Sequence, residues 1–139
     1  MTLVEVIPSL LTAPSTVEDV TRFATQSLGK QAVLAPDRSG FLVNALLVPY
    51  LLAAIRTLEN RVATRDDIDA GMVGGCGMPM GPLRLCDLIG LDTMLLVAQS
   101  LYAEHLEPAF APPSLLCRHV DAGWLGRKSG RGFYEYAAT

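Results

Sequence analysis

Glu5 is the first residue whose type and surroundings point to chemistry. It lies inside the short apolar segment 3–7, where alternation along a strand turns it away from its apolar neighbours. A solvent-facing position on an edge strand would explain such a carboxylate without any function. A carboxylate under partial cover would instead orient a cationic or proton-accepting group, most naturally a histidine. Because His105 and His119 are distant in sequence, we expect that partner to come from outside the chain.

Asn44 is the one polar residue in the first two turns of the apolar segment 41–60. If the amide is buried, it needs hydrogen-bond partners, and tying loop backbone to a helix would supply them. Alternatively, Asn44 faces a cleft and donates to a substrate oxygen. A helix that begins just after Ser39 and Gly40 would aim its N-terminal N–H groups at the same place. The spacing favours neither interpretation.

The glycine-rich segment 74–82 is a poor match to a phosphate-binding loop. Counted from Gly75, the last position of a G-x-G-x-x-G pattern is Met80, and a helix rather than a strand precedes it. We expect a turn that shapes an apolar pocket with Met78 and Met80. One basic cluster offers a second place for a phosphate group, although a solvated surface is the usual role of such a cluster. It comprises Arg118, His119, Arg127, Lys128 and Arg131.

The composition limits the class of protein. The 139 residues fit one domain, or one domain with part of another. Apolar residues make up 50% and charged residues 18%, against a usual charged share of about 25%, so we expect surface that a partner chain or further domain covers. The net charge of -3 argues against a nucleic-acid partner.

Cysteine usage and hydrophobic segments indicate the cellular location. The three cysteines have neither C-x-x-C nor zinc-ligand spacing, which predicts buried free thiols in a reducing cytosol and no metal site. The longest apolar segment, 41–55, is too short for a membrane span, which needs about 20 residues, and it contains Pro49. No basic leader opens the sequence. We therefore predict a cytoplasmic protein without a membrane partner.

Residues 1–36 predict a strand, a helix and a strand. The β-branched segment 2–7 and the segment 31–35 suit short strands, and 15–28 has the period of an amphipathic helix, with Ser15 and Glu18 as its capping box. This order is a βαβ unit of a parallel sheet. Since two strands alone are marginally stable in water, we expect the unit to complete a larger sheet.

The sequence from residue 37 onward predicts a helical body of about five helices. Pro49 should bend the central helix, 41–60. We expect Thr64 to cap a helix of about eight to ten residues that ends at 71–75, Asp92 to cap another helix, and Ser114 a third. The tail 123–136 predicts an irregular lid. The further helices are expected at 83–89, 92–106 and 115–122.

Seven segments in colinear order resemble the C-terminal part of the NAD-dependent (S)-3-hydroxyacyl-CoA dehydrogenases, and most closely the short-chain 3-hydroxybutyryl-CoA dehydrogenases. The resemblance implies a mainly α fold: residues 37–139 form a helical domain of the 6-phosphogluconate-dehydrogenase C-terminal type, for substrate binding and dimerisation. Residues 1–36 are then the βαβ remnant of an NAD-binding Rossmann domain. The matching segments are 3–7, 37–44, 47–51, 66–69, 77–83, 87–93 and 126–134.

The resemblance also implies residue roles. Glu5 matches the family glutamate that pairs with the catalytic histidine, and Asn44 matches the asparagine that hydrogen-bonds near the reacting oxygen. The family histidine in H-F-F-N-P, its assisting serine, the G-x-G-x-x-G loop and the acidic ribose ligand are absent from the sequence. Ala45 and Ser39 stand where the family usually has arginine and proline. The substrate-binding residues that we expect are Asn44, Met78, Pro79, Met80 and Gly81.

The implied function is part of an oxidoreductase of fatty-acid and butanoate metabolism. In the family reaction of β-oxidation, (S)-3-hydroxyacyl-CoA and NAD give 3-oxoacyl-CoA and NADH. We expect NAD to serve the complete enzyme and not to bind this chain, which alone should be inactive. The expected partners are acyl-CoA, a Rossmann domain missing or supplied in trans, and a second copy in a homodimer. The alternatives are a stand-alone acyl-CoA-binding or dimerisation module and a purely structural helical protein.

Overall fold

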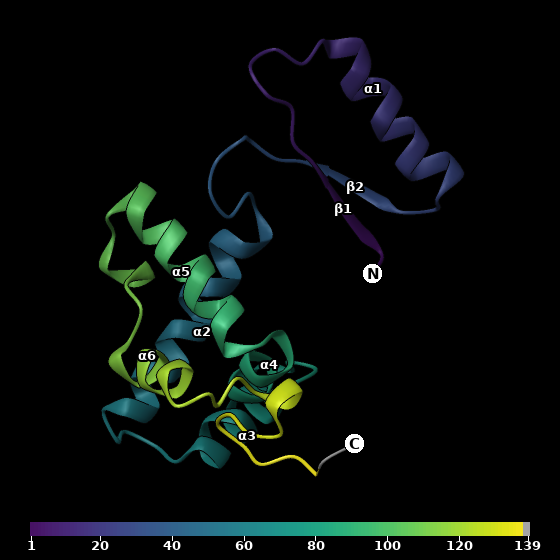
Figure 1. The fold of residues 1–139 in the computed structure, drawn as a ribbon. Helices are drawn as coiled ribbons and strands as arrows, with labels where there is room; N and C mark the ends of the chain where they lie inside the picture. The colour runs from purple at the N-terminus through teal and green to yellow at the C-terminus, as the bar shows by residue number, and fades with distance from the viewer. Residues whose placement is uncertain (138–139) are drawn as a thin grey trace. The chain divides into compact units, whose positions relative to one another are not determined.

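The computed structural model describes residues 1–137, which form two compact units, one from Met1 to Ala45 and one that begins at Leu46 (Figure 1). The division falls inside helix α2 (Val43–Glu59). The sequence instead places a domain boundary after residue 36, and that assignment stays a prediction.

The first unit is a βαβ arrangement, as the sequence predicts. Strands β1 (Leu3–Val6) and β2 (Gln31–Leu34) pair in parallel with Leu3 opposite Gln31, and helix α1 (Pro14–Arg22) connects them. A π-helical turn, Phe23–Ser27, continues α1. The predicted capping box is wrong, because α1 begins after Ala13 and no side chain caps it. Pro14 takes the first helical position instead, where its missing N–H costs nothing.

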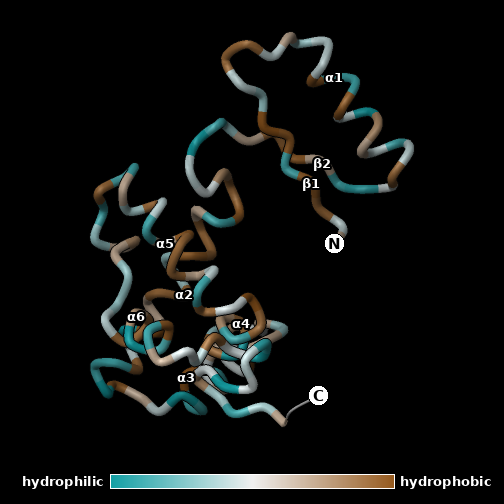
Figure 2. Tube along the Cα trace, in the orientation of Figure 1, coloured by the Kyte–Doolittle hydropathy of each residue, from teal (hydrophilic) through white to brown (hydrophobic). Residues whose placement is uncertain are grey.

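The first unit contains several apolar segments, drawn in brown in Figure 2, and many of their side chains are exposed. Among the described hydrophobic residues of this unit, only Val6, Ala24 and Ala35 are buried. Phe23 is 57% exposed and Leu34, at the end of β2, is 63% exposed. So little buried surface fits the expectation that the sheet continues in another part of the protein.

The second unit is helical. It contains α2 from Leu46 onward and four more α-helices, in agreement with the predicted body of about five helices. Two 3₁₀ turns, Pro108–Phe110 and Arg127–Ser129, lie in the connections. The four helices are α3 (Arg65–Cys76), α4 (Pro82–Ile89), α5 (Leu91–His105) and α6 (Ser114–Asp121).

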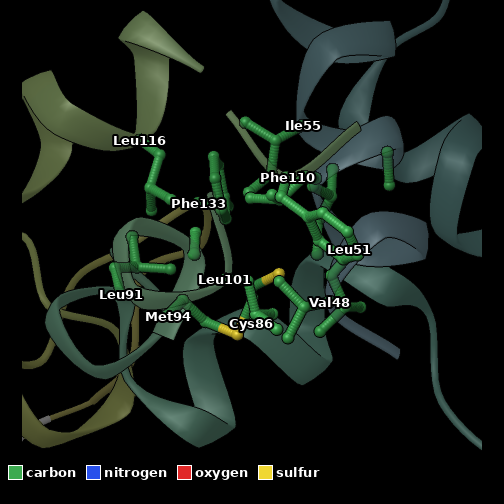
Figure 3. Packing of buried hydrophobic residues seen from close by; sticks show 14 of the residues in the cluster. Val48, Leu51, Ile55, Cys86, Leu91, Met94, Leu101, Phe110, Leu116 and Phe133 are labelled. Atoms are coloured by element: carbon green, nitrogen blue, oxygen red, sulfur yellow. The ribbon is translucent and has the colours of Figure 1, made fainter. Parts of the chain in front are cut away.

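One hydrophobic cluster holds these helices together (Figure 3). Leu51 and Ile55 of α2 and Leu101 of α5 are fully buried. Burial of a leucine side chain contributes about 1.5–3 kcal/mol, so the cluster is the main source of stability. Burial also raises the pKa of the Cys86 thiol in α4, which therefore stays protonated. Other members include Val48, Leu91, Met94, Phe110, Leu116 and Phe133.

None of the helices among residues 1–137 is by itself long and apolar enough to cross a membrane. Helices α4 and α5 meet that criterion only as a pair, with a bend of 97° between them.

Helix α3 is longer than the sequence predicts. Thr64 caps it as expected, since its hydroxyl accepts the Asp67 N–H at 3.2 Å. The helix does not end at 71–75 but continues to Cys76, and Gly77 ends it with a left-handed φ of 68°. Each glycine inside a helix costs up to about 1 kcal/mol. The packing of α3 on α4 through the buried Asp69 offsets that cost.

Two other predicted caps are wrong because groups from elsewhere in the chain satisfy the helix ends. No side chain caps α5; the Leu91 N–H donates to the Leu125 carbonyl at 3.2 Å, and the Asp92 carboxylate pairs with Lys128 Nζ at 2.6 Å. At α6, Ser114 does not cap, and Glu59 at the end of α2 accepts the Leu115 N–H at 2.8 Å. Local sequence cannot show such long-range partners.

The irregular tail is fixed to α4 by Asp87, which is 1% exposed. Its carboxylate accepts the N–H groups of Phe133 and Tyr134 and the hydroxyl of Tyr136, each at 2.9 Å. The approach is so close that a methyl group on Gly132 would overlap the Asp87 carboxylate. The tail is thus bound to the helical body through one buried carboxylate.

We expect Gly132→Ala to lower the free energy of unfolding by about 3 kcal/mol, because the added carbon displaces the Asp87 carboxylate from its three donors. The control is Gly74→Ala in α3, where a side chain meets no atom within 4 Å. Alanine favours a helix, so this variant should gain about 0.5–1 kcal/mol. Urea denaturation followed by circular dichroism measures both; equal stabilities would contradict the steric argument.

Candidate functional site

The Glu5 side chain is hydrogen-bonded to the N-terminus of α2 within the first unit. Its Oε1 accepts the N–H groups of Leu42 at 2.8 Å and Val43 at 3.1 Å. These donors belong to the N–H groups that a helix cannot satisfy internally, and a negative charge stabilises that end. Glu5 is therefore not simply a solvated strand residue. A carboxylate offers about four acceptor positions, so its second oxygen can still serve a histidine.

The backbone before α2 turns sharply to present these N–H groups. Gly40 has φ 81° and Phe41 has φ 45°, both in the left-handed region. For a residue with a side chain this conformation costs about 1–2 kcal/mol. The two bonds to Glu5 offset that cost, so the carboxylate and the turn depend on each other. Glu5 also borders a small cavity of about 290 Å³ between β1 and α1.

Asn44 lies in the first turn of α2, directly after Val43, and is exposed. A buried Asn44 that hydrogen-bonds loop backbone to the helix was one of the two interpretations. The exposed position of Asn44 argues against it. Its amide is open to a ligand at the same helix end that Glu5 holds. The substrate role of Asn44 stays a prediction.

Residues 77–81, which we call the substrate loop, connect α3 to α4. Met78 and Pro79 are exposed, Met80 is partly buried and Gly81 is buried. The first N–H groups of α4 already donate to Asp69, so they are not available to a phosphate. This arrangement agrees with the view that the glycine-rich segment is not a phosphate-binding loop.

An apolar groove of about 440 Å³ runs between α2 and α3 of the second unit. Small side chains form its floor, and Met78 and Met80 are not among the residues that line it. The expected apolar pocket around these two methionines is therefore not the groove that the structure displays. The lining includes Tyr50, Ala53, Thr57, Ile68 and Met72.

Side chains of the basic cluster form ion pairs with carboxylates or stack on an aromatic ring. These contacts favour the interpretation of the cluster as solvated surface rather than as a phosphate site. Lys128 pairs with Asp92, and Arg118 lies 3.9 Å from Glu59. Arg131 stacks 3.8 Å above the Trp124 ring and lies 3.7 Å from Glu135. His119 is partly buried against Phe133 and Trp124, and burial lowers its pKa, so it is neutral at pH 7.

The sequence analysis missed two buried carboxylates as important residues, Asp69 in α3 and Asp87 in α4. The signal was present, since each is an acidic residue beside apolar neighbours in a helix, the same pattern that singled out Glu5. Both bind backbone N–H groups of distant segments.

Within residues 1–137, no group of three or more His, Cys, Asp or Glu side chains could hold a metal ion.

Comparisons with known proteins identify similar sequences. Residues 40–136 match the family model described as 3-hydroxyacyl-CoA dehydrogenase, C-terminal domain. A 3-hydroxybutyryl-CoA dehydrogenase of Mycobacterium tuberculosis is 54% identical over 134 residues, which are 96% of this chain and 47% of that protein. The human mitochondrial hydroxyacyl-coenzyme A dehydrogenase is 42% identical over 98% of this chain and 43% of its own length.

Solved structures that are similar to this chain come from the same family. The crystal structure of FadB2 from M. tuberculosis has a TM-score of 0.97 at 54% identity and matches 99% of this chain and 48% of that one. The (S)-3-hydroxybutyryl-CoA dehydrogenase PaaH1 from Ralstonia eutropha has a TM-score of 0.96 at 43% identity, with 99% and 48% covered. The chain spans about half the length of the relatives it matches.

We expect Glu5→Ala to raise the amide exchange rates of Leu42 and Val43 about fivefold, because a lost N-terminal cap costs about 1 kcal/mol. Glu5→Gln keeps a carbonyl acceptor and should have the smaller effect. Glu18→Ala, on the exposed face of α1, removes the same charge and serves as the control. Hydrogen exchange followed by NMR measures all three; unchanged rates in Glu5→Ala would contradict the cap.

Proposed function

The chain belongs to the 3-hydroxyacyl-CoA dehydrogenase family, and we propose that it forms the C-terminal, substrate-binding half of such an enzyme. A Rossmann domain that these 139 residues do not include would supply NAD and the catalytic histidine. The reaction is the oxidation of a (S)-3-hydroxyacyl-CoA, with 3-hydroxybutyryl-CoA as the substrate that the similar proteins' names favour.

The proposal rests on the two hydrogen bonds between the Glu5 carboxylate and the N–H groups at the start of α2. Glu5 is the residue expected to orient the histidine, and Asn44 is the residue expected to donate to the reacting oxygen. The N–H groups that Glu5 accepts belong to the two residues directly before Asn44. One carboxylate therefore fixes the helix turn that carries the amide. A correctly oriented general base contributes about 10²–10⁴-fold to the rate.

NAD does not fit the described residues. Residues 1–137 contribute two parallel strands, and the glycine-rich segment follows a helix, with its neighbouring N–H groups bound to Asp69. A dinucleotide site needs a glycine-rich turn between a strand and a helix. We derive no step through NAD for this chain. The hydride transfer belongs to the complete enzyme, and the part of this chain is to position substrate and histidine.

A second copy of the chain is the further partner that we propose, in a homodimer through the helical unit. Several large apolar side chains of that unit are exposed, which is unusual for a bare monomer surface. The exposed side chains include Leu46, Val62, Leu88, Leu96 and Leu106.

The three cysteines are free thiols, which supports the cytoplasm as the location. The prediction that the thiols are buried is correct for Cys86 but wrong for Cys76, which is exposed, while Cys117 is partly buried.

The second candidate is a stand-alone acyl-CoA-binding or dimerisation module that pairs with a separate Rossmann chain. The two-stranded sheet favours it, because β1 and β2 each pair on one side only. An unpaired edge accepts a further strand through its backbone N–H and C=O groups. The activity is the same in both candidates; only the gene that encodes the Rossmann domain differs.

The proposal is tested by titration of the purified chain with acetoacetyl-CoA in a calorimeter. We expect saturable binding, weakened about threefold to tenfold in Asn44→Ala, since one hydrogen bond is worth about 0.5–1.5 kcal/mol. Asn60→Ala, at the exposed far end of α2, is the control and should bind like the parent chain. An NADH absorbance assay should show no turnover. Absence of saturable binding would refute the substrate role, and turnover above a protein-free blank would refute the need for a second domain.

The homodimer is tested by analytical ultracentrifugation. We expect a species of twice 14.9 kDa at micromolar concentration, because apolar surface is removed from water when two copies meet. Leu96→Lys, which places a charge on an exposed position of α5, should shift the species toward the monomer if α5 contributes to the interface. Sedimentation of the parent chain as a monomer alone would overturn the homodimer.

A further inference from the structure

We propose that Tyr134 is a positioning residue for the substrate loop, although it lies more than 50 residues further along the chain. Its hydroxyl fixes the Asp69 carboxylate, and that carboxylate holds the end of the loop at the start of α4. The inference rests on the proposed function, in which the loop contacts acyl-CoA.

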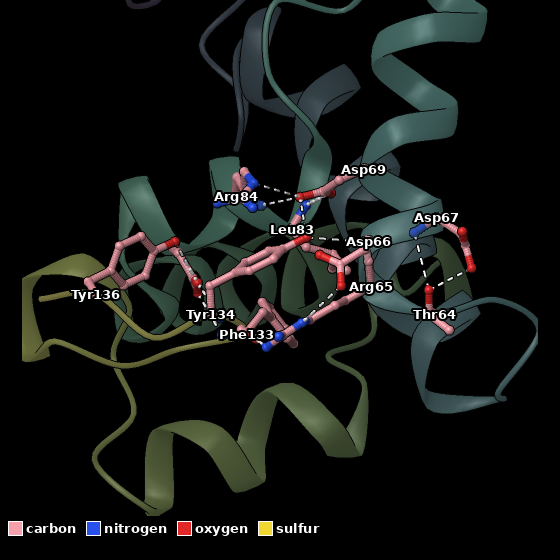
Figure 4. A network of polar contacts seen from close by, with 11 residues as sticks. Thr64, Arg65, Asp66, Asp67, Asp69, Leu83, Arg84, Phe133, Tyr134 and Tyr136 are labelled. Carbon is pink, nitrogen blue, oxygen red and sulfur yellow. Dashed lines mark hydrogen bonds and ion pairs between the residues drawn. The ribbon is translucent and has the colours of Figure 1, made fainter.

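Asp69 is the link between the two helices that flank the loop. It lies in α3, is 5% exposed, and accepts the N–H groups of Leu83 at 2.8 Å and Arg84 at 3.1 Å (Figure 4). Those N–H groups belong to the first turn of α4. The other end of the loop is fixed by the left-handed cap at Gly77. The loop is thus held at both ends, and Asp69 provides the attachment to α4.

Gly81 makes this attachment possible. A methyl group at that position would overlap the Asp69 carboxylate, so the backbone before α4 lies directly against the side chain. A carboxylate in such close contact cannot move without moving the loop. Any group that orients Asp69 therefore also orients residues 77–81.

Tyr134 is the group that orients Asp69. Its hydroxyl donates to Asp69 Oδ2 at 2.9 Å (Figure 4). The Cζ atoms of Arg84 and Arg65 stack on its ring, 3.9 Å and 4.7 Å from the ring centroid. Its backbone N–H is bound to Asp87. Burial and the bond to Asp69 raise the pKa of Tyr134, so the hydroxyl remains a donor at neutral pH. The tyrosine is therefore fixed independently of the loop that it positions.

Tyr136 provides a matched control. Its hydroxyl also donates to a buried carboxylate at 2.9 Å, but that carboxylate is Asp87, which binds the tail and not the loop. Tyr134→Phe and Tyr136→Phe each remove one hydroxyl and keep the ring. A general loss of stability would affect the two variants alike, whereas positioning of the loop concerns Tyr134 alone.

The first test is hydrogen exchange of the backbone amides, followed by NMR on the chain without ligand. We expect Tyr134→Phe to speed exchange of Met78, Met80, Leu83 and Arg84 about fivefold, the effect of one lost hydrogen bond, and Tyr136→Phe to leave these amides unchanged. Arg84→Gln, at a half-exposed side chain, removes a cation from the ring face and gives a milder test that keeps the fold, with about twofold faster exchange. Equal exchange in Tyr134→Phe and Tyr136→Phe would overturn the inference.

The second test is acetoacetyl-CoA binding by the same variants. We expect the dissociation constant of Tyr134→Phe to rise at least threefold and that of Tyr136→Phe to equal the parent value. If the parent chain binds and Tyr134→Phe binds equally well, Tyr134 does not position the substrate loop. If the parent chain does not bind at all, the proposed function fails, and the exchange experiment still decides whether Tyr134 holds the loop.

Discussion

Buried carboxylates that accept backbone N–H groups join segments of this protein that are distant in sequence. An ionised carboxylate taken out of water costs several kcal/mol unless hydrogen bonds replace its hydration. Asp69 and Asp87 each accept three hydrogen bonds, two from backbone N–H groups and one from a tyrosine hydroxyl. Because these donors belong to other segments, each buried carboxylate joins its own helix to them. Glu5 and Glu59, which are only partly buried, also accept backbone N–H groups, at the starts of α2 and α6. The hydrophobic cluster supplies most of the stability, but the carboxylates determine which helix end meets which loop.

This use of carboxylates explains which parts of the fold could be predicted from the sequence. Apolar periodicity and β-branched residues indicated the βαβ unit and the helices, because these signals are local. The caps predicted at Ser15, Asp92 and Ser114 were wrong. Helix α1 begins with Pro14, which has no N–H to be capped, whereas Leu125 and Glu59 accept N–H groups at the starts of α5 and α6. Both of these acceptors lie far away in sequence. The roles of Asp69 and Asp87 were missed for the same reason: the sequence marks both as acidic residues beside apolar neighbours, but their hydrogen-bond partners lie up to 65 residues away.

The candidate site could be predicted in part. Glu5 and Asn44 were singled out from their apolar neighbours, and the family match of residues 40–136 confirms the resemblance that suggested their roles. The sequence could not show that Glu5 binds the turn directly before Asn44, because that contact depends on the left-handed backbone of Gly40 and Phe41. A positive φ at phenylalanine has no sequence signature.

The distance along the chain between Asp87 and its donors also has a consequence for synthesis. Helix α4 contains a carboxylate whose three donors lie 46, 47 and 49 residues later. A ribosome adds about 5–20 residues per second, so for several seconds α4 has emerged while its partners have not. During that interval Asp87 must remain hydrated, and α4 cannot complete its packing. Folding of the helical unit is therefore expected to finish only after residues 133–136 have left the ribosome. Until then, the hydrated Asp87 carboxylate keeps α4 from packing fully into the core.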